Sequence, residues 1–387
     1  MLKCVSAYTN EIDYPEIALG EIKMQLLDRI PLLNNTVGII MCHPEFIASG
    51  VTEYICDKLP FDIAGVTTAS QAVNDNAGEM ILTLFMMTSD DTRFRTGVSD
   101  LTTGNINAAV KSAYEEASAG EDNPPKLALI FPPYIVNQLS GDAYVKAWDE
   151  IIPNTPVFGT IAADDTVEFR DCETIYNGKS SQKAMPFILC YGKINPRFLI
   201  ATLPESSSLT LRGTVTKSKN NFVYEVNNIE ARKFFKASGI DGSMIAVPWM
   251  LGSAESNNRD SVPVIRELFT YSEDDAAVFG GDVEEGSTIL LLDFDSKSIK
   301  TTSKRQIEKI NSLQDVNGAL LFSCTSRRFV LFGVNDDFAE LQIANDTIRQ
   351  DIPFMLGYSG GEICPVIDDS GIINNRFHNY SMAILVV

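Results

Sequence analysis

Two short stretches near the C-terminus hold the residue types best suited to chemistry, and the first of them is FSCTSRR. In this stretch Cys324 closes an apolar run, and Arg327 and Arg328 follow it. An arginine can hold a carboxylate through two parallel hydrogen bonds, and it would lower the pKa of a nearby thiol. The stretch therefore predicts a binding role for Arg327, with Cys324 beside it. The alternative is a half-buried cysteine followed by two solvated arginines.

The second stretch is GYSGGE, which follows another short apolar run. Its glycines allow a close approach of the backbone and expose N–H groups, and its acid could accept the ammonium group of a ligand. Combined with Arg327, such a loop would suit a zwitterion such as an amino acid. The alternative is a glycine turn whose acid pairs with an arginine. The candidate ligand-binding residues of this loop are Gly357, Ser359, Gly360, Gly361 and Glu362.

The chain has two histidines, His43 in CHPE and His378 in FHNYS. Each could serve as an acid–base group or as a haem ligand, although a hydrogen-bonded histidine at a strand end is the commoner arrangement. Asp164, in AADD, could bind an amine or a divalent ion, and a solvated turn or helix cap is the alternative. No HExxH motif occurs, so a zinc hydrolase of that kind is excluded and no metal site is expected.

Several other chemistries lack their motifs. The sequence contains no phosphate-binding loop of the GxxxxGK[ST] or GxGxxG type and no GxSxG nucleophile elbow. Cys324 could be the nucleophile of an enzyme only with a base beside it, and the sequence identifies none. No catalytic residue is therefore assigned.

The composition of the chain limits the kinds of molecule that it can bind. The 387 residues include 31 Lys plus Arg and 51 Asp plus Glu, which gives a net charge of −20. Such a chain repels nucleic acid and anionic membranes, and its longest apolar runs are too short to span a bilayer. The seven cysteines are odd in number and form no CxxC pair, which argues against a disulfide framework and a structural zinc site. We expect a cytoplasmic protein that binds neither nucleic acid nor membrane.

Three segments repeat one plan: Thr36–Ser70, Lys126–Asp165 and Gly318–Glu362. Each opens with an apolar run, continues with an amphipathic stretch of helical spacing, and closes with a second apolar run that ends in glycine. The plan predicts three strand–helix–strand units with parallel strands. Ligands of open parallel sheets bind beyond the carboxyl ends of the strands, where the candidate residues lie.

Each of the other two copies has a glycine at the position of Gly357, so we expect its first role to be structural. The third copy is distinguished by Gly360, Gly361 and Glu362, and the predicted binding function depends on these residues.

The predicted fold class is mixed α/β, with partly antiparallel sheets and two halves that pack on each other. The first half, residues 1–205, reads as a tandem duplication of the first two units. The second half, residues 206–387, contains the third unit, preceded by two strands, a helix and several antiparallel strands. No linker rich in Pro, Gly and Ser separates the halves.

The order of these motifs resembles that of FIST-domain proteins over nearly the whole chain. GTVTKSKNNFVYEVNNIEARKFF, VPVIRELF, GALLFSCTSRR, GYSGGEICP and FHNYSMAILVV resemble the C-terminal half of that family, and FDIAGVTTAS and VFGTIAADD resemble the N-terminal half. The resemblance implies an intracellular sensory module for a small ligand such as an amino acid, and some relatives bind haem and respond to nitric oxide. Because the chain ends just after its last strand, we expect its signal to pass to a separate protein.

These observations predict a sensory module that binds an amino acid or a related metabolite and signals to a separate partner. Two alternatives stay open. One is a haem-binding nitric-oxide sensor with His378 or His43 as the axial ligand, and the other is an enzyme with Cys324 as its nucleophile.

Overall fold

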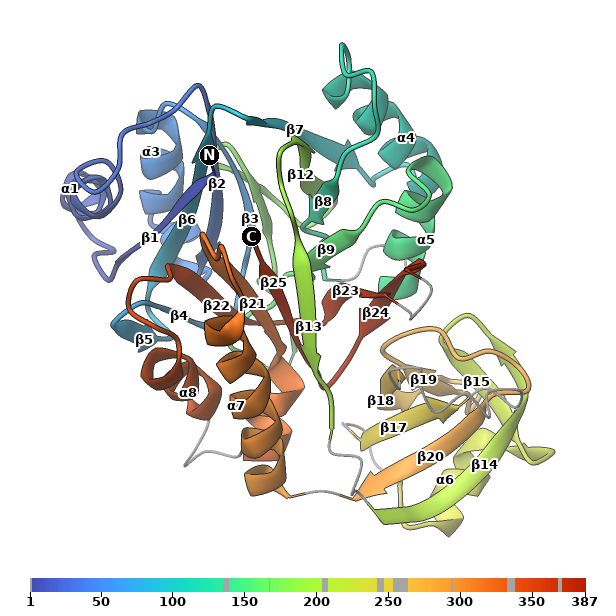
Figure 1. Cartoon of the computed structure of the whole chain (residues 1–387). Coiled ribbons are helices and arrows are strands. Elements are labelled where there is room, and N and C mark those ends of the chain that lie inside the picture. Colours follow the sequence, from blue (N-terminus) through green and yellow to red (C-terminus); the bar gives the residue numbers. More distant parts are fainter. Residues whose placement is uncertain are drawn as a thin grey trace.

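The computed structural model describes residues 2–134, 139–166, 168–203, 208–241, 247–252, 264–293, 295–332, 338–367 and 371–387. Three six-stranded sheets, A, B and C, surround one core, and a seven-stranded sheet D lies to one side (Figure 1). The mixed α/β class and the partly antiparallel sheets predicted from the sequence are confirmed.

The first two repeats follow the predicted plan without interruption. The elements of the first repeat are β1 (Lys3–Thr9), α1 (Pro15–Leu26), β2 (Asn35–Cys42), α2 (Glu45–Ala48), α3 (Val51–Lys58), β3 (Asp62–Thr67), β4 (Ser70–Val73), β5 (Asn76–Gly78) and β6 (Leu82–Ser89). Those of the second are β7 (Thr92–Asp100), α4 (Ile106–Ala117), β8 (Leu127–Ile130), α5 (Gly141–Ile151), β9 (Val157–Thr160), β10 (Thr174–Tyr176), β11 (Lys179–Ser181) and β12 (Ala184–Gly192).

The third repeat has the same plan, but sheet D is inserted into it. It opens with β13 (Arg197–Ala201) and resumes with α7 (Ser296–Ser312), β21 (Ala319–Cys324), the π-helical turn η1 (Arg327–Phe332), α8 (Ala339–Thr347), β22 (Phe354–Ser359), β23 (Glu362–Ile367), β24 (Ile373–His378) and β25 (Met382–Val386). The insertion comprises β14 (Ser208–Lys219), β15 (Phe222–Val226), β16 (Ile229–Glu230), α6 (Ala231–Ala237), β17 (Val247–Gly252), β18 (Val264–Tyr271), β19 (Ala277–Phe279) and β20 (Thr288–Asp293).

Each repeat builds one sheet and lends a hairpin to another. The parallel pairs predicted from the sequence are present as β2–β3, β8–β9 and β21–β22. The hairpin β4–β5 then joins sheet B, β10–β11 joins sheet A, and β23–β24 joins sheet C. The three sheets therefore have equivalent strand orders, with A as β1-β6-β2-β3-β10-β11, B as β13-β25-β21-β22-β4-β5 and C as β7-β12-β8-β9-β23-β24.

Alternation along the buried strands divides the apolar side chains between two layers. In β2, Val37, Ile39 and Met41 enter the central core that all three sheets share, whereas Ile40 and Cys42 pack under the helices of the first repeat. This follows from the two-residue period of a strand, and a strand covered on both faces reads as a continuous apolar run. The helices lie outside the sheets (Figure 1).

The repeated glycines have a packing role, as predicted for Gly357. A Cβ atom on Gly65 or Gly159 would collide with the carbonyl oxygen of the paired strand, and one on Gly357 would lie 2.5 Å from Sδ of Met41. Real Cβ atoms do not approach other atoms so closely, so a larger residue would force the strands apart.

Among the described helices, none is both long and apolar enough to cross a membrane. The boundary predicted at residues 205 and 206 lies outside the described residues.

Candidate ligand site at the strand ends

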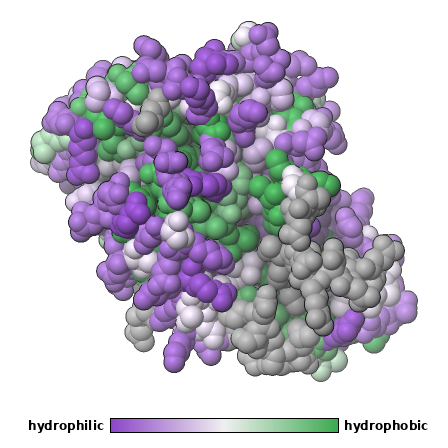
Figure 2. All heavy atoms as spheres, in the orientation of Figure 1, coloured by the Kyte–Doolittle hydropathy of each residue, from purple (hydrophilic) through white to green (hydrophobic). Residues whose placement is uncertain are grey.

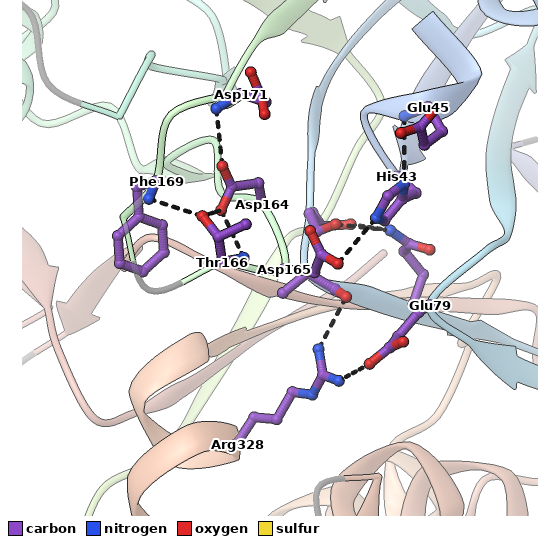
Figure 3. Close-up of polar contacts among 12 residues, drawn as sticks. His43, Glu45, Glu79, Asp164, Asp165, Thr166, Phe169, Asp171 and Arg328 are labelled. Carbon is purple, nitrogen blue, oxygen red and sulfur yellow. Dashed lines mark hydrogen bonds and ion pairs between the residues drawn. The ribbon is translucent and has the colours of Figure 1, made fainter. Parts of the chain in front are cut away.

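The loops that follow the strands of the three repeats meet in one polar cluster, the loop cluster (Figure 3). His43 of the first repeat lies with its Nε2 atom 3.3 Å from Oδ2 of Asp165 of the second. Arg328 of the third repeat pairs with Glu79 of the first and donates to the carbonyl oxygen of Ala69 at 3.0 Å. Loops from all three repeats therefore lie together at this end of the sheets.

Within the loop cluster, the predicted ligands are engaged by the protein itself. The Nδ1 atom of His43 accepts the backbone N–H of Glu45 at 3.3 Å. The buried carboxylate of Asp164 accepts the backbone N–H groups of Thr166 and Asp171, each at 2.8 Å, and the Thr166 hydroxyl at 2.8 Å. These contacts make Asp164 the organiser of its own turn, which is the alternative that the sequence left open, and they disfavour it as the partner of a ligand amine.

Arg327 is fully buried and forms an ion pair with Glu340 of α8, with Nη2 2.7 Å and Nε 3.1 Å from Oε1. It also donates to the Ser303 hydroxyl at 2.7 Å and to the Tyr380 carbonyl oxygen at 2.9 Å. The solvated arginine that was the alternative reading is therefore wrong for this residue. These bonds also correct the expectation that Arg327 holds a ligand carboxylate. Its guanidinium instead donates hydrogen bonds to α7, to α8 and to the turn before β25, and so links these three elements.

Glu362 and Cys324 lie in the same buried region, and each carries a raised pKa. One oxygen of Glu362 accepts the Ser381 hydroxyl at 2.6 Å, and Oε1 has no hydrogen-bond partner among the described residues. Burial raises the pKa of Glu362 well above its usual range, although Ser381 and Arg327 oppose the shift.

The environment of Cys324 corrects the expectation that an arginine lowers its pKa. Burial and then the nearby Glu362 and Glu267 raise the pKa of this thiol, which keeps it protonated at neutral pH. A nucleophile needs the thiolate, so these surroundings disfavour the alternative in which Cys324 attacks a substrate.

Glu267 is a buried acid that the sequence reasoning missed. It lies on β18 of sheet D, 3% exposed, and accepts the Ser326 hydroxyl at 2.5 Å and the Tyr380 hydroxyl at 3.4 Å. Burial raises its pKa to about 7. The signal that could have identified it is the charged pair Arg266–Glu267 inside the otherwise apolar run VIRELF, because charges are rare in buried strands unless they have partners.

A cavity of about 230 Å³ lies where sheet D meets the repeats, and we call it the junction cavity. Tyr134, Ile161, Gly360, Phe377 and the first turn of α5 line one wall. The other wall belongs to sheet D and to the turn before β15, and it includes Asn221, Phe222, Phe269, Phe279 and Gly280.

The junction cavity lies next to the strand segment that carries Glu267. Tyr134 lines the cavity, and burial and then the charge of Glu267 raise its pKa. Gly280 donates its backbone N–H to the carbonyl oxygen of Glu267 at 2.8 Å. Asn221 lines the cavity with an Oδ1 atom that is buried and has no partner in the described part of the chain.

The GYSGGE loop is the crossing from sheet B to sheet C. The N–H of Gly360 donates to the Ile161 carbonyl oxygen at 2.9 Å, so that amide is not free to cradle a ligand as predicted. Gly361 has φ +132°, where a Cβ atom would lie 2.5 Å from the Phe377 ring. Ser359 accepts a hydrogen bond from the Thr160 hydroxyl. Of this loop, Gly360 reaches the junction cavity.

The two histidines do not fit a haem iron in this structure. The Nε2 atom of His378 lies 3.2 Å from the carbonyl oxygen of Cys364, and burial lowers the pKa of His378 to about 3. His43 has contacts at both ring nitrogens. An axial ligand needs a ring nitrogen directed at open space, whereas His378 is buried and both ring nitrogens of His43 have contacts. No group of three His, Cys, Asp or Glu within the described ranges is placed to hold a metal ion.

The comparison with protein families decides the identity. Residues 36–229 match the FIST N domain, and residues 226–365 match the FIST C domain. The chain is a FIST-domain protein. The two matches meet inside sheet D, at β15 and β16. These two matches confirm the resemblance seen in the sequence. FIST domains are recognised as sensory and signal-transduction domains. A search of curated proteins found no match to this FIST protein.

Proposed function

We propose that this FIST protein senses a small ligand in the junction cavity and reports it to a separate protein. The observation that carries the proposal is the position of the cavity, because its walls come from two separately built parts of the molecule. Binding sites commonly form at such junctions, where a ligand can contact both parts. At about 230 Å³ the cavity is smaller than a typical drug-sized site, which favours a small metabolite.

The lining favours an amino acid with an apolar or aromatic side chain, or a closely related molecule. Phe222, Phe269, Phe279 and Phe377 offer apolar surface for such a side chain. The unpaired Oδ1 atom of Asn221 can accept a ligand N–H. The first N–H groups of a helix have no partner within the helix, so the N–H of Gly141, which lines the cavity at the start of α5, can donate to a ligand carboxylate.

Polar contacts across the junction suggest how occupancy is reported. The Arg266 guanidinium of sheet D donates to both carboxylate oxygens of Asp142 in α5, at 2.9 and 3.1 Å. Lys146 of α5 pairs with Asp282 of the insertion at 2.7 Å. A ligand that contacts both walls of the junction cavity favours the arrangement of sheet D and the repeats in which both walls fit it. It can shift the population of that arrangement only as far as it binds it more tightly than the alternative arrangement.

A thermal-shift screen of the twenty amino acids and related metabolites tests the proposal. At least one apolar or aromatic amino acid should raise the melting temperature, because a ligand that binds only the folded state stabilises it. Val278→Phe places a larger side chain in the cavity and should abolish the shift. Ile229→Phe, an exposed position elsewhere on sheet D, is the matched control and should retain it. No shift with any compound, or an equal shift in both variants, would overturn the proposal.

A further inference from the structure

The three repeats provide an internal comparison of their outer helices. The helices α1, α4 and α7 each precede the first parallel strand of a repeat, and each packs its inner face on a sheet. On α4 the outer face is polar and carries the exposed ion pair Lys111–Glu115, with Nζ and Oε1 3.9 Å apart. On α7 the exposed positions are also polar, and they include Lys304, Arg305, Glu308 and Lys309.

The outer face of α1 is different, because apolar side chains are exposed on it beside the acids Glu16 and Glu21. Tyr14, Ile17 and Met24 are 61%, 51% and 66% exposed, and Leu32 lies just beyond the helix at 37%. Apolar side chains reach the surface at the left edge of Figure 2, where Figure 1 places α1. Since α4 and α7 have polar outer faces at equivalent places, the fold does not require apolar residues here. Exposed apolar side chains gathered on one helix face mark an interaction surface.

Gly20 lies on this face between Ile17 and Met24, and it adds a second observation. Glycine inside a helix is destabilising relative to alanine. A Cβ atom on Gly20 would meet nothing within 4 Å, so no neighbour in this chain excludes a side chain there. A partner backbone that approaches closely would explain the glycine.

The surroundings of α1 indicate the charge of that partner. A hollow of about 520 Å³ beside the helix is lined by Tyr8, Asn10, Glu11, Glu21, Met24 and Gln25. Glu21 lies on the outer face between Ile17 and Met24, and one of its oxygens accepts the Thr9 hydroxyl at 2.5 Å. Glu11 lies beside it, and one of its oxygens accepts the backbone N–H groups of Asp13 and Tyr14.

The other charges near this face are also mostly acidic. Asp13, Glu16 and Asp28 are exposed close by, against Lys23 and Arg29. A second copy of the chain would set these acids against each other, whereas a basic partner would be attracted.

We propose that the outer face of α1 binds an amphipathic helix of a separate protein. The apolar side chains of that helix cover Tyr14, Ile17 and Met24, its backbone passes over Gly20, and a lysine or arginine enters the hollow between Glu11 and Glu21. This mode is the burial of an apolar helix face with charges at its edge. The inference rests on the proposed function only in treating the partner as the output of the sensor.

The first test uses a fluorescein-labelled synthetic helix of Leu and Lys, measured by anisotropy in 0.15 M salt. The wild-type protein should bind this peptide, and Met24→Glu should weaken binding at least tenfold. Ser112→Glu adds the same charge to the exposed face of α4 and should leave the affinity within twofold. Absence of binding, or equal losses in the two variants, would overturn the inference. Val278→Phe, which fills the junction cavity, should not change peptide binding. A failure of the ligand proposal can therefore be told apart from a failure of this docking proposal.

Two further measurements bear on Gly20 and on self-association. Gly20→Ala should raise the melting temperature and weaken peptide binding, and a lowered melting temperature would show that the fold itself needs this glycine. Sedimentation should show a monomer for the wild type and for Met24→Glu. A dimer that Met24→Glu dissociates would make a second copy the occupant of this face and would overturn the choice of partner.

Discussion

Replacing Arg327 by methionine separates a structural role from a binding role for this residue. Arg327 and Glu340 are both fully buried, so the substitution leaves Glu340 as a charge without its partner. Breaking a buried ion pair on one side costs about 3–5 kcal/mol of unfolding free energy. We expect Arg327→Met to destabilise the protein by about that amount.

A second substitution checks the cause of the loss. Glu340→Gln in the Arg327→Met background removes the unpaired charge and keeps a side chain that can bond to Ser303 and Ser323. The double variant should recover roughly 2 kcal/mol, since residues in contact show coupling of this size.

Urea unfolding followed by tryptophan fluorescence measures these changes, because Trp148 of the second repeat and Trp249 of sheet D are both buried. The assay thus reports on both parts of the molecule. If Arg327→Met changed the unfolding free energy by less than about 1 kcal/mol and abolished stabilisation by an amino acid, the structural reasoning would be refuted and Arg327 would be a ligand-binding residue.

Three other predictions follow from the same buried groups. The pKa of Glu267 in the folded state is about 7, above the ordinary value of 4.5, so the folded state binds this proton more tightly than the unfolded state. The unfolding free energy should therefore fall by roughly 3 kcal/mol, for this group alone, as the pH rises from about 4.5 to 7. Urea unfolding of Glu267→Gln should lack this part of the pH dependence, and an unchanged pH profile would contradict the assignment. Iodoacetamide at pH 7 should alkylate Cys324 slowly in the native protein, because burial and neighbouring acids keep its thiol protonated. Rapid and selective labelling of Cys324, measured by mass spectrometry, would instead favour an enzyme with Cys324 as its nucleophile. Haemin added to the wild-type protein should give no sharp Soret band, because Nε2 of His378 is in contact with a backbone carbonyl oxygen. A saturable Soret band that is lost in the His378→Ala variant would favour the haem-based gas sensor.

Much of the fold could be predicted because it is encoded in local patterns. Apolar runs, helical spacing and glycines recur in all three copies, and they predicted the parallel pairs that the structure contains. The two strands predicted at the start of the second half form the hairpin β14–β15, and Asn220 in its turn has the positive φ of 55° that favours asparagine there. The exchange of hairpins between sheets was not predicted, because pairing between distant segments leaves no mark on local periodicity.

The candidate site was predicted less well, for reasons of side-chain direction. The sequence placed Arg327 and Glu362 near each other but could not show that Arg327 turns toward Glu340, thirteen residues further along the chain. Glu267 was missed because it comes from an inserted sheet whose packing on the strand ends no local pattern reveals. Of the predicted loop residues, Gly360 does line the cavity.

Hydrogen exchange measured by mass spectrometry, with and without the amino acid that stabilises the protein most, tests the central claim most directly. The account predicts added protection at the start of α5, at residues 220–222, at residues 277–281 and around Gly360, where both walls of the junction cavity lie. Protection confined to the loop cluster around His43 and Asp165, or no added protection on sheet D, would contradict the claim that the ligand binds between sheet D and the repeats.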